Sequence, residues 1–251
     1  MKKYNKKSIF SAILAMFMAI GLMAVSTVKA SASTTITDKN KVALCFRESN
    51  YVYHASYQFA NYIRVNKNIA NKKVYLRYRD QGEEWQTEEA RYVADLDNDY
   101  EIYVAYCGKM GGYYECDLVC ESGDTTYIDD NDGKHYTGQT LGTASVCALR
   151  TPSPCDSYFK VSALVKNYAY EKEVAVRYTT DGWKTYKEAE LKYDSVVDDG
   201  NEIWSTTLNL PEGTISGDKF EYAIRYTVNG NTYWDNNFGR NYNASYHHNY
   251  L

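Results

Sequence analysis

The chain has 251 residues, of which 44% are hydrophobic, and a formal net charge of −4. Five of the 28 basic residues and none of the 32 acidic residues lie within positions 1–30, so the remainder carries a charge of 23 − 32 = −9. This acidic balance argues against nucleic acid as a partner, because binding to phosphates requires clustered positive charge.

The first 30 residues are predicted to be an export signal. Four lysines within the first seven residues precede an apolar run from Ile9 to Val25, and small-x-small cleavage sites follow at 28–30 and 30–32. An uncleaved membrane anchor is the alternative, since the apolar run is at the short end of the roughly 17–25 residues that span a bilayer. We therefore expect a secreted, extracellular protein with no membrane contact after signal cleavage.

The six cysteines, at positions 45, 107, 116, 120, 147 and 155, all follow this segment. An even number of cysteines in an exported chain favours disulfides, with about 15 possible pairings. A Cys147–Cys155 bridge around two prolines and a Cys107–Cys116 bridge between neighbouring predicted strands are two candidates. A zinc site is the alternative, but the spacings lack a CxxC pair.

The body of the chain shows alternation of apolar and polar residues at period 2, which predicts short β-strands. The alternation is clear over 172–179, 203–210 and 220–228. Asp181-Gly182 and Asn229-Gly230 supply the turn chemistry of hairpins. Tyrosine, with 27 residues against 7 phenylalanines, also suits half-buried strands. Short antiparallel strands at this spacing are typical of a β-sandwich.

Two parts of the body align at a nearly fixed offset, which indicates an internal repeat. Val74-Tyr75-Leu76-Arg77-Tyr78 matches Val174-Ala175-Val176-Arg177-Tyr178, and Trp85 falls near Trp183. We therefore predict an all-β fold of two tandem immunoglobulin-like antiparallel β-sandwich domains after the N-terminal signal peptide. The predicted domains are residues 1–30, 40–144 and 146–251, with a boundary near 145–154.

Residues 231–242 combine aromatic rings, carboxamides and one cation in a segment without an apolar run. Flat rings stack on the C–H faces of sugars, and an asparagine side chain offers both a donor and an acceptor to neighbouring hydroxyls. This composition is typical of a carbohydrate-binding loop. A fainter copy of the segment lies at 126–136.

The second copy resembles a carbohydrate-binding module of family 21, which includes fungal starch-binding domains and the glycogen-binding domains of protein phosphatase 1 targeting subunits. The resemblance is carried by three stretches, at 165–174, at 176–186 and at 230–242. It implies an immunoglobulin-like β-sandwich that binds α-1,4-glucan without a catalytic role. It also implies carbohydrate-binding roles for two stacking tryptophans and five polar or aromatic residues: Trp183, Trp234, Asn236, Asn241, Asn167, Tyr170 and Lys172.

The first copy departs from this pattern at the positions that matter for sugar binding. Trp85 is retained, but one stacking face and two carboxamides are missing, so a glucan site of the same kind is doubtful there. Its counterparts to Trp234, Asn236, Asn241 and Tyr170 are Ile128, Asp130, His135 and Ala70. The acidic run 129–133 suggests calcium as an alternative, because hard cations prefer oxygen ligands, but it lacks the spacing of a helix-loop-helix site.

We therefore expect an exported, non-catalytic protein that binds starch, glycogen or maltooligosaccharides, with separate amylolytic enzymes as further candidate partners. No catalytic residue, metal ligand or cofactor is predicted. A glycoside hydrolase is one alternative, for which Asp198-Asp199 and the pair Asp97 and Asp99 are the available carboxyl groups. A structural or adhesive protein with vestigial sugar sites is another. Phosphatase targeting is not expected, because the chain looks exported and shows no docking motif.

Overall fold

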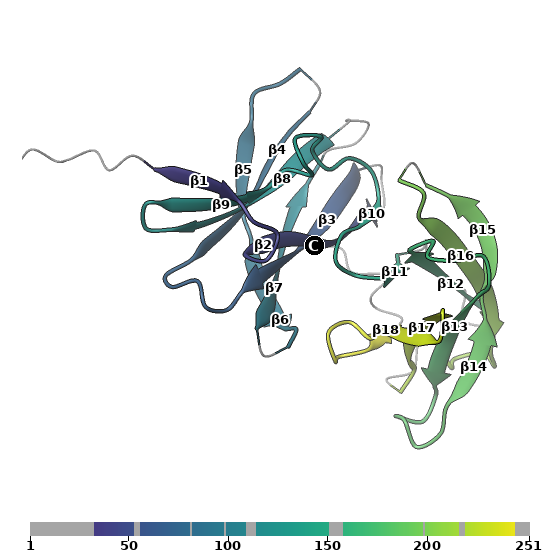
Figure 1. Ribbon diagram of the computed structural model, residues 1–251. Helices are drawn as coiled ribbons and strands as arrows, with labels where there is room; N and C mark the ends of the chain where they lie inside the picture. Colours follow the sequence, from purple (N-terminus) through teal and green to yellow (C-terminus); the bar gives the residue numbers. More distant parts are fainter. Residues whose placement is uncertain are drawn as a thin grey trace, which may run out of the picture. The chain divides into compact units, whose positions relative to one another are not determined.

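The computed structural model describes residues 33–52, 56–80, 82–97, 99–108, 114–150, 158–197, 199–215 and 219–243 (Figure 1). These ranges contain β-strands and no α-helix, so the predicted all-β fold is confirmed for them. Accordingly, none of them contains a helix that could cross a membrane. The predicted signal peptide, residues 1–30, lies outside the described residues, as do Cys155 and the histidines at 247 and 248.

Residues 34–141 form two five-stranded sheets, which we call the N-terminal sheet pair. The strands of each pair are antiparallel except β1 and β9, which run parallel. One sheet has the order β1 (Thr34–Thr37), β9 (Thr125–Asp129), β8 (Tyr114–Ser122), β4 (Lys73–Asp80) and β5 (Gln86–Glu89). The other has the order β10 (Thr140–Leu141), β2 (Val42–Val52), β3 (Ser56–Asn66), β7 (Tyr100–Cys107) and β6 (Arg91–Asp95).

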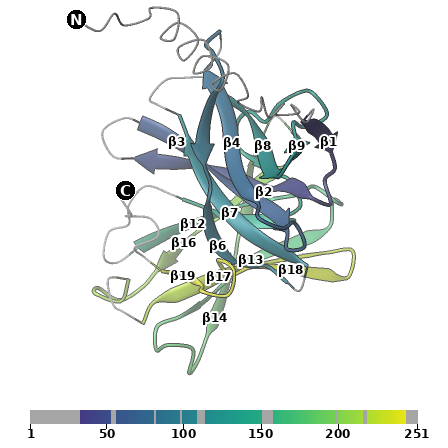
Figure 2. The ribbon, with the colours of Figure 1, turned by 90° about the vertical axis from the view of Figure 1, so that its left-hand side faces the viewer.

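Residues 146–243 form the C-terminal sheet pair, in which every pairing is antiparallel. One sheet has the order β11 (Val146–Leu149), β12 (Tyr158–Val165), β16 (Glu202–Asn209) and β15 (Lys192–Val196). The other has the order β14 (Lys187–Glu190), β13 (Lys172–Thr179), β17 (Glu221–Val228) and β18 (Asn231–Asp235), and β19 (Tyr242–Asn243) also pairs with β17. Figure 2 shows β13, β17 and β18 side by side.

Each sheet pair buries its own core, which follows from the period-2 pattern of its strands. In the N-terminal pair, Leu76 of β4 and Leu118 of β8 pack in one cluster with Ile63 of β3. In the C-terminal pair, Val176 of β13 packs with Phe159 of β12. Burying one such side chain stabilises the fold by about 1.5–3 kcal/mol. Each core therefore joins its two sheets into a sandwich.

A third cluster, the junction cluster, contains residues from both sheet pairs. Phe46 and Tyr62 come from β2 and β3, Leu149 and Leu164 come from β11 and β12, and Phe238 packs against them from the loop after β18. This cluster matters below because Phe238 belongs to the segment that the sequence marks as a binding loop.

The predicted disulfides are absent from the described residues. Cys45, Cys107, Cys116, Cys120 and Cys147 are all buried free thiols. Cys107 and Cys116 do lie together, since a hydrogen bond from Cys116 lowers the pKa of the Cys107 thiol to about 7. The sequence thus identified neighbours but not their bonding state. The candidate Cys147–Cys155 bridge involves a residue outside the described ranges.

Candidate functional site

The loop between β18 and β19 is built around the buried carboxylate of Asp235. This carboxylate accepts hydrogen bonds from the backbone N–H of Ala148 at 2.6 Å, from the Tyr242 hydroxyl at 2.8 Å and from the backbone N–H of Asn237 at 3.2 Å. Burial raises the pKa of Asp235, and the hydrogen bonds from Ala148, Tyr242 and Asn237 oppose that shift. The loop is therefore anchored to β11 and β19 at its base.

Three non-glycine residues of this loop have a left-handed backbone: Asn237, Phe238 and Asn241, with φ of 53°, 54° and 58°. Asparagine tolerates this conformation, which explains two of the three positions. The side chain of Asn237 donates to the carbonyl oxygen of Asn241 at 3.0 Å, and the side-chain oxygen of Asn236 accepts the backbone N–H of Gly239 at 2.9 Å. The carboxamides thus shape the loop, while the side-chain N–H₂ of exposed Asn236 donates no hydrogen bond to another residue that the structure describes.

Trp183 lies in the hairpin after β13 and also has a left-handed backbone, with φ of 65°. Its backbone N–H donates to the Thr179 hydroxyl at 3.0 Å. The Asp181 carboxylate accepts the backbone N–H of Thr185 at 3.0 Å, its hydroxyl at 2.8 Å and the Thr179 hydroxyl at 2.8 Å. These hydrogen bonds, led by the backbone one, lower the pKa of Asp181 to about 2. A compact turn therefore fixes the position of Trp183.

Glu221 of β17 joins this hairpin to the loop. Its carboxylate accepts the indole N–H of Trp183 at 2.6 Å and the side-chain N–H of Asn241 at 2.9 Å. The result is an open pocket of about 240 Å³, which we call the tryptophan pocket. It is lined by Arg177, Trp183, Ala223, Trp234, Asn236 and Asn241. Four of the seven predicted site residues are therefore brought together here.

The sequence interpretation missed Arg177 and Glu221 as parts of this site. The Arg177 guanidinium lies over the Trp234 ring, 4.7 Å from its centroid, and over the Tyr186 ring at 4.4 Å. Its Nε donates to Glu188 at 2.8 Å. Burial raises the pKa of Glu188, but hydrogen bonds from Arg177 and a neighbouring arginine outweigh this effect and leave the pKa lowered. Trp234 is still 43% exposed, so its ring remains accessible to a ligand.

The other three predicted residues lie at the start of β13 and in the turn before it. Lys172 donates to Asn167 at 2.6 Å and to Glu202 at 2.8 Å, and Tyr170 is 94% exposed. Lys172 and Arg177 are five positions apart along β13, which corresponds to about 16 Å. The predicted set therefore divides into the tryptophan pocket and a second patch, formed by Asn167, Tyr170 and Lys172.

Trp204 of β16 lies at the edge of the C-terminal core. Its ring is half-buried and packs against the C-terminal cluster. Its indole N–H donates to Glu202 at 2.9 Å, and the ring meets Tyr193 edge-on, with centroids 6.2 Å apart. Trp204 therefore borders the second patch through Glu202.

The N-terminal sheet pair contains a loop with the same internal hydrogen bonds. Asp129 accepts the backbone N–H of Leu44 at 3.0 Å and the Tyr136 hydroxyl at 2.8 Å, as Asp235 does from Ala148 and Tyr242. The side chain of Asn131 donates to the carbonyl oxygen of residue 135 at 3.1 Å, which repeats the bond made by Asn237. These equivalences extend the sequence alignment of the two copies to individual atoms.

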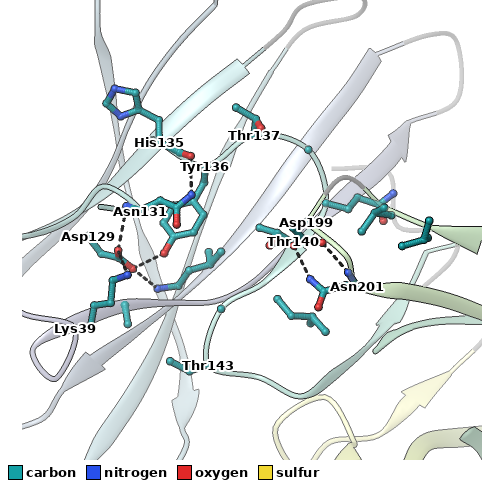
Figure 3. Close-up of a pocket in the computed structure, with 18 residues that line it drawn as sticks. Lys39, Asp129, Asn131, His135, Tyr136, Thr137, Thr140, Thr143, Asp199 and Asn201 are labelled. Carbon is teal, nitrogen blue, oxygen red and sulfur yellow. Dashed lines mark hydrogen bonds and ion pairs between the residues drawn. The ribbon is translucent and has the colours of Figure 1, made fainter. Parts of the chain in front are cut away.

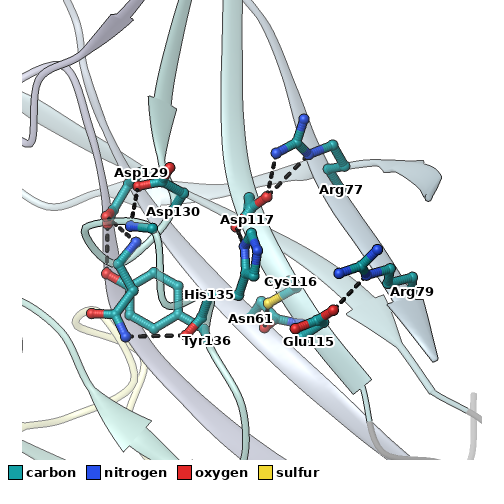
Figure 4. Close-up of polar contacts among 12 residues, drawn as sticks. Asn61, Arg77, Arg79, Glu115, Cys116, Asp117, Asp129, Asp130, His135 and Tyr136 are labelled. Atoms are coloured by element: carbon teal, nitrogen blue, oxygen red, sulfur yellow. Dashed lines mark hydrogen bonds and ion pairs between the residues drawn. The ribbon is translucent and has the colours of Figure 1, made fainter. Parts of the chain in front are cut away.

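The side chains on this N-terminal loop make a different surface (Figure 4). The carboxylate of Asp117 is buried between Arg77, at 2.5 Å, and His135, at 2.6 Å. The guanidinium groups of Arg77 and Arg79 both lie over the Trp85 ring, 4.7 and 4.5 Å from its centroid, and His135 meets the same ring edge-on at 5.0 Å. Trp85 is therefore half-buried, with two guanidinium groups and one imidazole ring against its indole ring.

The acidic run of this loop is committed to contacts within the protein. Besides the contacts of Asp129, Asp130 accepts the backbone N–H of Gly133 at 3.1 Å, and Asp132 pairs with Lys39 at 3.1 Å. Within the described ranges, no three histidine, cysteine, aspartate or glutamate side chains are grouped as metal ligands would be. The alternative of a calcium site in this loop therefore gains no support.

Another pocket, of about 780 Å³, has a different chemistry (Figure 3). Its walls combine hydroxyls, carboxamides and carboxylates with aliphatic groups, and no tryptophan lines it. Asp199 in this pocket accepts hydrogen bonds from Thr140 and Asn201. Asp97, from the other candidate carboxyl pair, caps a turn by accepting the backbone N–H groups of Asp99 and Tyr100. Asp198, the partner of Asp199 in its candidate pair, lies outside the described residues. Asp97 and Asp99 share one turn and do not face each other across a cleft, as glycoside hydrolysis requires.

Comparisons with known proteins give a family match for the C-terminal sheet pair. The profile of the carbohydrate/starch-binding module (family 21) matches residues 146–245. The chain is 40% identical over 80 residues to protein phosphatase 1 regulatory subunit 3B of Homo sapiens, which is 31% of this chain and 28% of that protein. It is 38% identical over 80 residues to regulatory subunit 3C of Bos taurus, which is 31% of this chain and 25% of that protein. The chain thus spans little more than a quarter of the length of these relatives.

Two solved structures are similar to the chain at low overall superposition. The starch-binding domain of Rhizopus oryzae glucoamylase, in complex with beta-cyclodextrin and maltoheptaose, is 29% identical with a TM-score of 0.33, over 40% of this chain and 92% of that one. The carbohydrate-binding module of the muscle glycogen-targeting subunit of protein phosphatase 1 is 31% identical with a TM-score of 0.34, over 39% of this chain and 73% of that one.

The relatives correct the predicted localisation. They are named as regulatory subunits of protein phosphatase 1, and they contradict the predicted secreted, extracellular localisation. The predicted resemblance to carbohydrate-binding module family 21 is confirmed for residues 146–245.

Proposed function

We propose that the C-terminal sheet pair binds α-1,4-glucan, as starch, glycogen or maltooligosaccharide, in the tryptophan pocket. The observation that carries this proposal is the convergence of four predicted residues into one open pocket: Trp183 from the hairpin after β13, Trp234 from the end of β18, and Asn236 and Asn241 from the loop after β18. Aromatic rings offer stacking faces to sugar rings, and carboxamides offer both donors and acceptors to sugar hydroxyls.

In this proposal the remaining residues of the pocket hold the binding groups in place. Glu221 orients Trp183 and Asn241 by accepting a hydrogen bond from each. Arg177 supports one face of Trp234 through a cation–π contact. The two rings are thus fixed before ligand arrives, which lowers the entropic cost of binding. The second patch, with exposed Tyr170 between Asn167 and Lys172, is a further contact for the same polymer.

We further propose that the chain contains two copies of one β-module, at 40–144 and 146–251, and that only the second binds glucan. The matching hydrogen bonds of Asp129 and Asp235 support a shared origin of the two loops. In the first copy, arginines cover Trp85 and no second tryptophan accompanies it, so a stacking platform is lacking.

Binding without catalysis is part of the proposal. Asp97 is engaged by backbone N–H groups of its own turn, and Asp199 by Thr140 and Asn201. Hydrolysis of a glycosidic bond instead requires two carboxyl groups facing the substrate.

Affinity electrophoresis through gels containing amylose, glycogen or cellulose tests the function. We expect retardation by the two α-glucans and none by cellulose, because two rings fixed on different loops suit a curved chain better than a flat one. Equal retardation by all three polymers, or by none, would contradict the proposal.

A second candidate function follows from the relatives. They are named as regulatory subunits of protein phosphatase 1, so the chain could recruit this phosphatase to glucan. Pull-down of the purified phosphatase catalytic subunit with the full chain immobilised on amylose tests this candidate. Recovery that is no greater than on amylose alone would leave glucan binding as the function and remove the phosphatase as a partner.

A further inference from the structure

Trp234 and Asn236 border not one pocket but two. Besides the tryptophan pocket, they line a second pocket of about 560 Å³, which we call the junction pocket. The N-terminal sheet pair contributes Arg64 of β3 and residues 95 and 96 of the β6–β7 hairpin to this second pocket. A ligand that extends past Trp234 would therefore contact both sheet pairs rather than the C-terminal pair only.

The wall of the junction pocket is held by an aromatic contact between the sheet pairs. Phe238, at the tip of the loop that carries Asn236, lies against Phe46 at a centroid distance of 6.1 Å and against Tyr62 at 5.7 Å. Phe46 and Tyr62 stack on each other at 4.3 Å and are almost fully buried. A backbone φ of 54° is strained for a residue as bulky as Phe238. The aromatic contact therefore offsets a conformational cost.

The counterpart of Phe238 in the N-terminal loop indicates that this contact is specific to the second loop. Residue 132 there has the same left-handed backbone, with φ of 56°, but is an exposed aspartate paired with Lys39. Aspartate tolerates this conformation better than phenylalanine. The second loop thus has phenylalanine, which is unfavourable in a left-handed backbone, at the position that packs against the other sheet pair.

The sizes of the two pockets bear on what they can hold. The tryptophan pocket, at about 240 Å³, falls below the roughly 300–1,000 Å³ of typical ligand sites, whereas the junction pocket, at about 560 Å³, falls within this range. The junction pocket also combines aromatic faces with polar groups, as sugar binding requires. A glucan chain bound at Trp183 has further glucose units beyond the tryptophan pocket. Trp234 lines both pockets, so these units can continue past it into the junction pocket.

We propose that the junction pocket is an additional subsite for the next glucose units of a chain held at Trp183, so that the N-terminal sheet pair contributes to glucan binding without a tryptophan platform of its own. This inference rests on the proposed function. It gives the first copy a role in glucan binding, which Trp85, with two arginines against its ring, does not provide. It also makes affinity depend on the length of the oligosaccharide.

The test compares maltotriose with maltoheptaose by titration calorimetry on the full chain. Leu96→Trp fills the junction pocket from the β6–β7 hairpin, where Leu96 is 41% exposed. Ile36→Trp is the matched control, since Ile36 is 38% exposed on β1 and lines neither pocket. We expect the blocking variant to weaken maltoheptaose binding about tenfold, which corresponds to the burial of one apolar group, and to leave maltotriose binding unchanged.

The outcomes separate the two proposals. Unchanged maltoheptaose affinity in the blocking variant overturns the subsite while leaving glucan binding intact, and absence of binding by the unaltered chain overturns both. An equal loss for both oligosaccharides also overturns the subsite, because the effect would then lie at the tryptophan pocket. Asp95→Trp, one position earlier on the same exposed hairpin, serves as a second blocking variant if Leu96→Trp fails to fold.

Discussion

Trp85 and Trp183 occupy corresponding hairpins of the two sheet pairs, yet their surroundings differ. Trp85 is covered by two guanidinium groups and a histidine ring. Trp183 instead lines an open pocket with Trp234, and its indole N–H is held by Glu221. The corresponding positions thus form a charged cluster in the N-terminal sheet pair and an aromatic pocket in the C-terminal sheet pair.

The difference arises from a few exposed positions, because the buried framework of the loop is the same. Asp129 and Asp235 each bind a tyrosine hydroxyl and a backbone N–H of a neighbouring strand. On β8, Asp117 takes the place of Ala223 on β17, so Arg77 is drawn into an ion pair that Arg177 cannot make. A single carboxylate therefore helps to convert a pocket into a filled cluster.

The largest expected effect on binding comes from the second stacking ring. Trp234→Ala should weaken binding to maltoheptaose by about tenfold or more, because a ring face worth roughly 1.5–3 kcal/mol of burial is lost. Trp85→Ala is the control and should leave the affinity unchanged within about twofold. Titration calorimetry on both variants measures this, and equal losses would mean that the two loops are functionally alike.

Removal of Asp117 tests how much the charged cluster around Trp85 contributes to stability. Asp117→Ala leaves Arg77 and His135 without their buried partner and should lower the free energy of unfolding by about 2–3 kcal/mol. Glucan affinity should not change, since the pocket lies in the other sheet pair. Chemical denaturation monitored by circular dichroism gives the stability. A loss below about 0.5 kcal/mol would show that the charged cluster contributes little.

The orienting role of Glu221 predicts a smaller effect on binding. Glu221→Ala removes both hydrogen bonds that hold Trp183 and Asn241, which should weaken glucan affinity about fivefold, as expected for about 1 kcal/mol of lost orientation. Glu115→Ala at the matching position of β8 is the control. An affinity loss in the control that equals that of Glu221→Ala would argue against a specific role for Glu221.

The smallest effect concerns the hairpin turn and depends on pH. The pKa of Asp181 is lowered from its ordinary value of 3.8 to about 2, so its carboxylate stabilises the folded state above 3.8 and this contribution is lost as the pH falls toward 2. Asp181→Asn should therefore lower the melting temperature at neutral pH, and the difference from the unaltered chain should vanish near pH 2. A difference that stays constant with pH would exclude this carboxylate as the cause.

Much of the fold and part of the site follow from local sequence patterns. Period-2 alternation located β13, β16 and β17 of the C-terminal sheet pair, and the aromatic and carboxamide composition of 231–242 indicated a candidate binding loop. The resemblance to family 21 also identified Trp183, although a tryptophan after Asp-Gly is not by itself a site. These features depend on residues close together in the chain, so they can be predicted from the sequence.

Features that depend on pairing across strands could not be read in the same way. The role of Glu221 depends on the register that places β17 beside β13, and the charged cluster around Trp85 depends on Asp117 facing Arg77. Phe238 gave no signal at all, because its partners Phe46 and Tyr62 lie far away in sequence. The disulfides and the secreted localisation were inferred from the N-terminal segment, and both inferences were wrong for the residues and relatives that test them.

The four tryptophans allow one direct test of the central claim that glucan binds at Trp183 and Trp234 and not at Trp85. Each indole N–H gives its own nuclear magnetic resonance signal, which single Trp→Phe variants assign. On titration with maltoheptaose, the signals of Trp183 and Trp234 should shift together with a common dissociation constant, while that of Trp85 stays in place. A shift of the Trp85 signal over the same concentration range, with Trp183 and Trp234 unchanged, would contradict the claim.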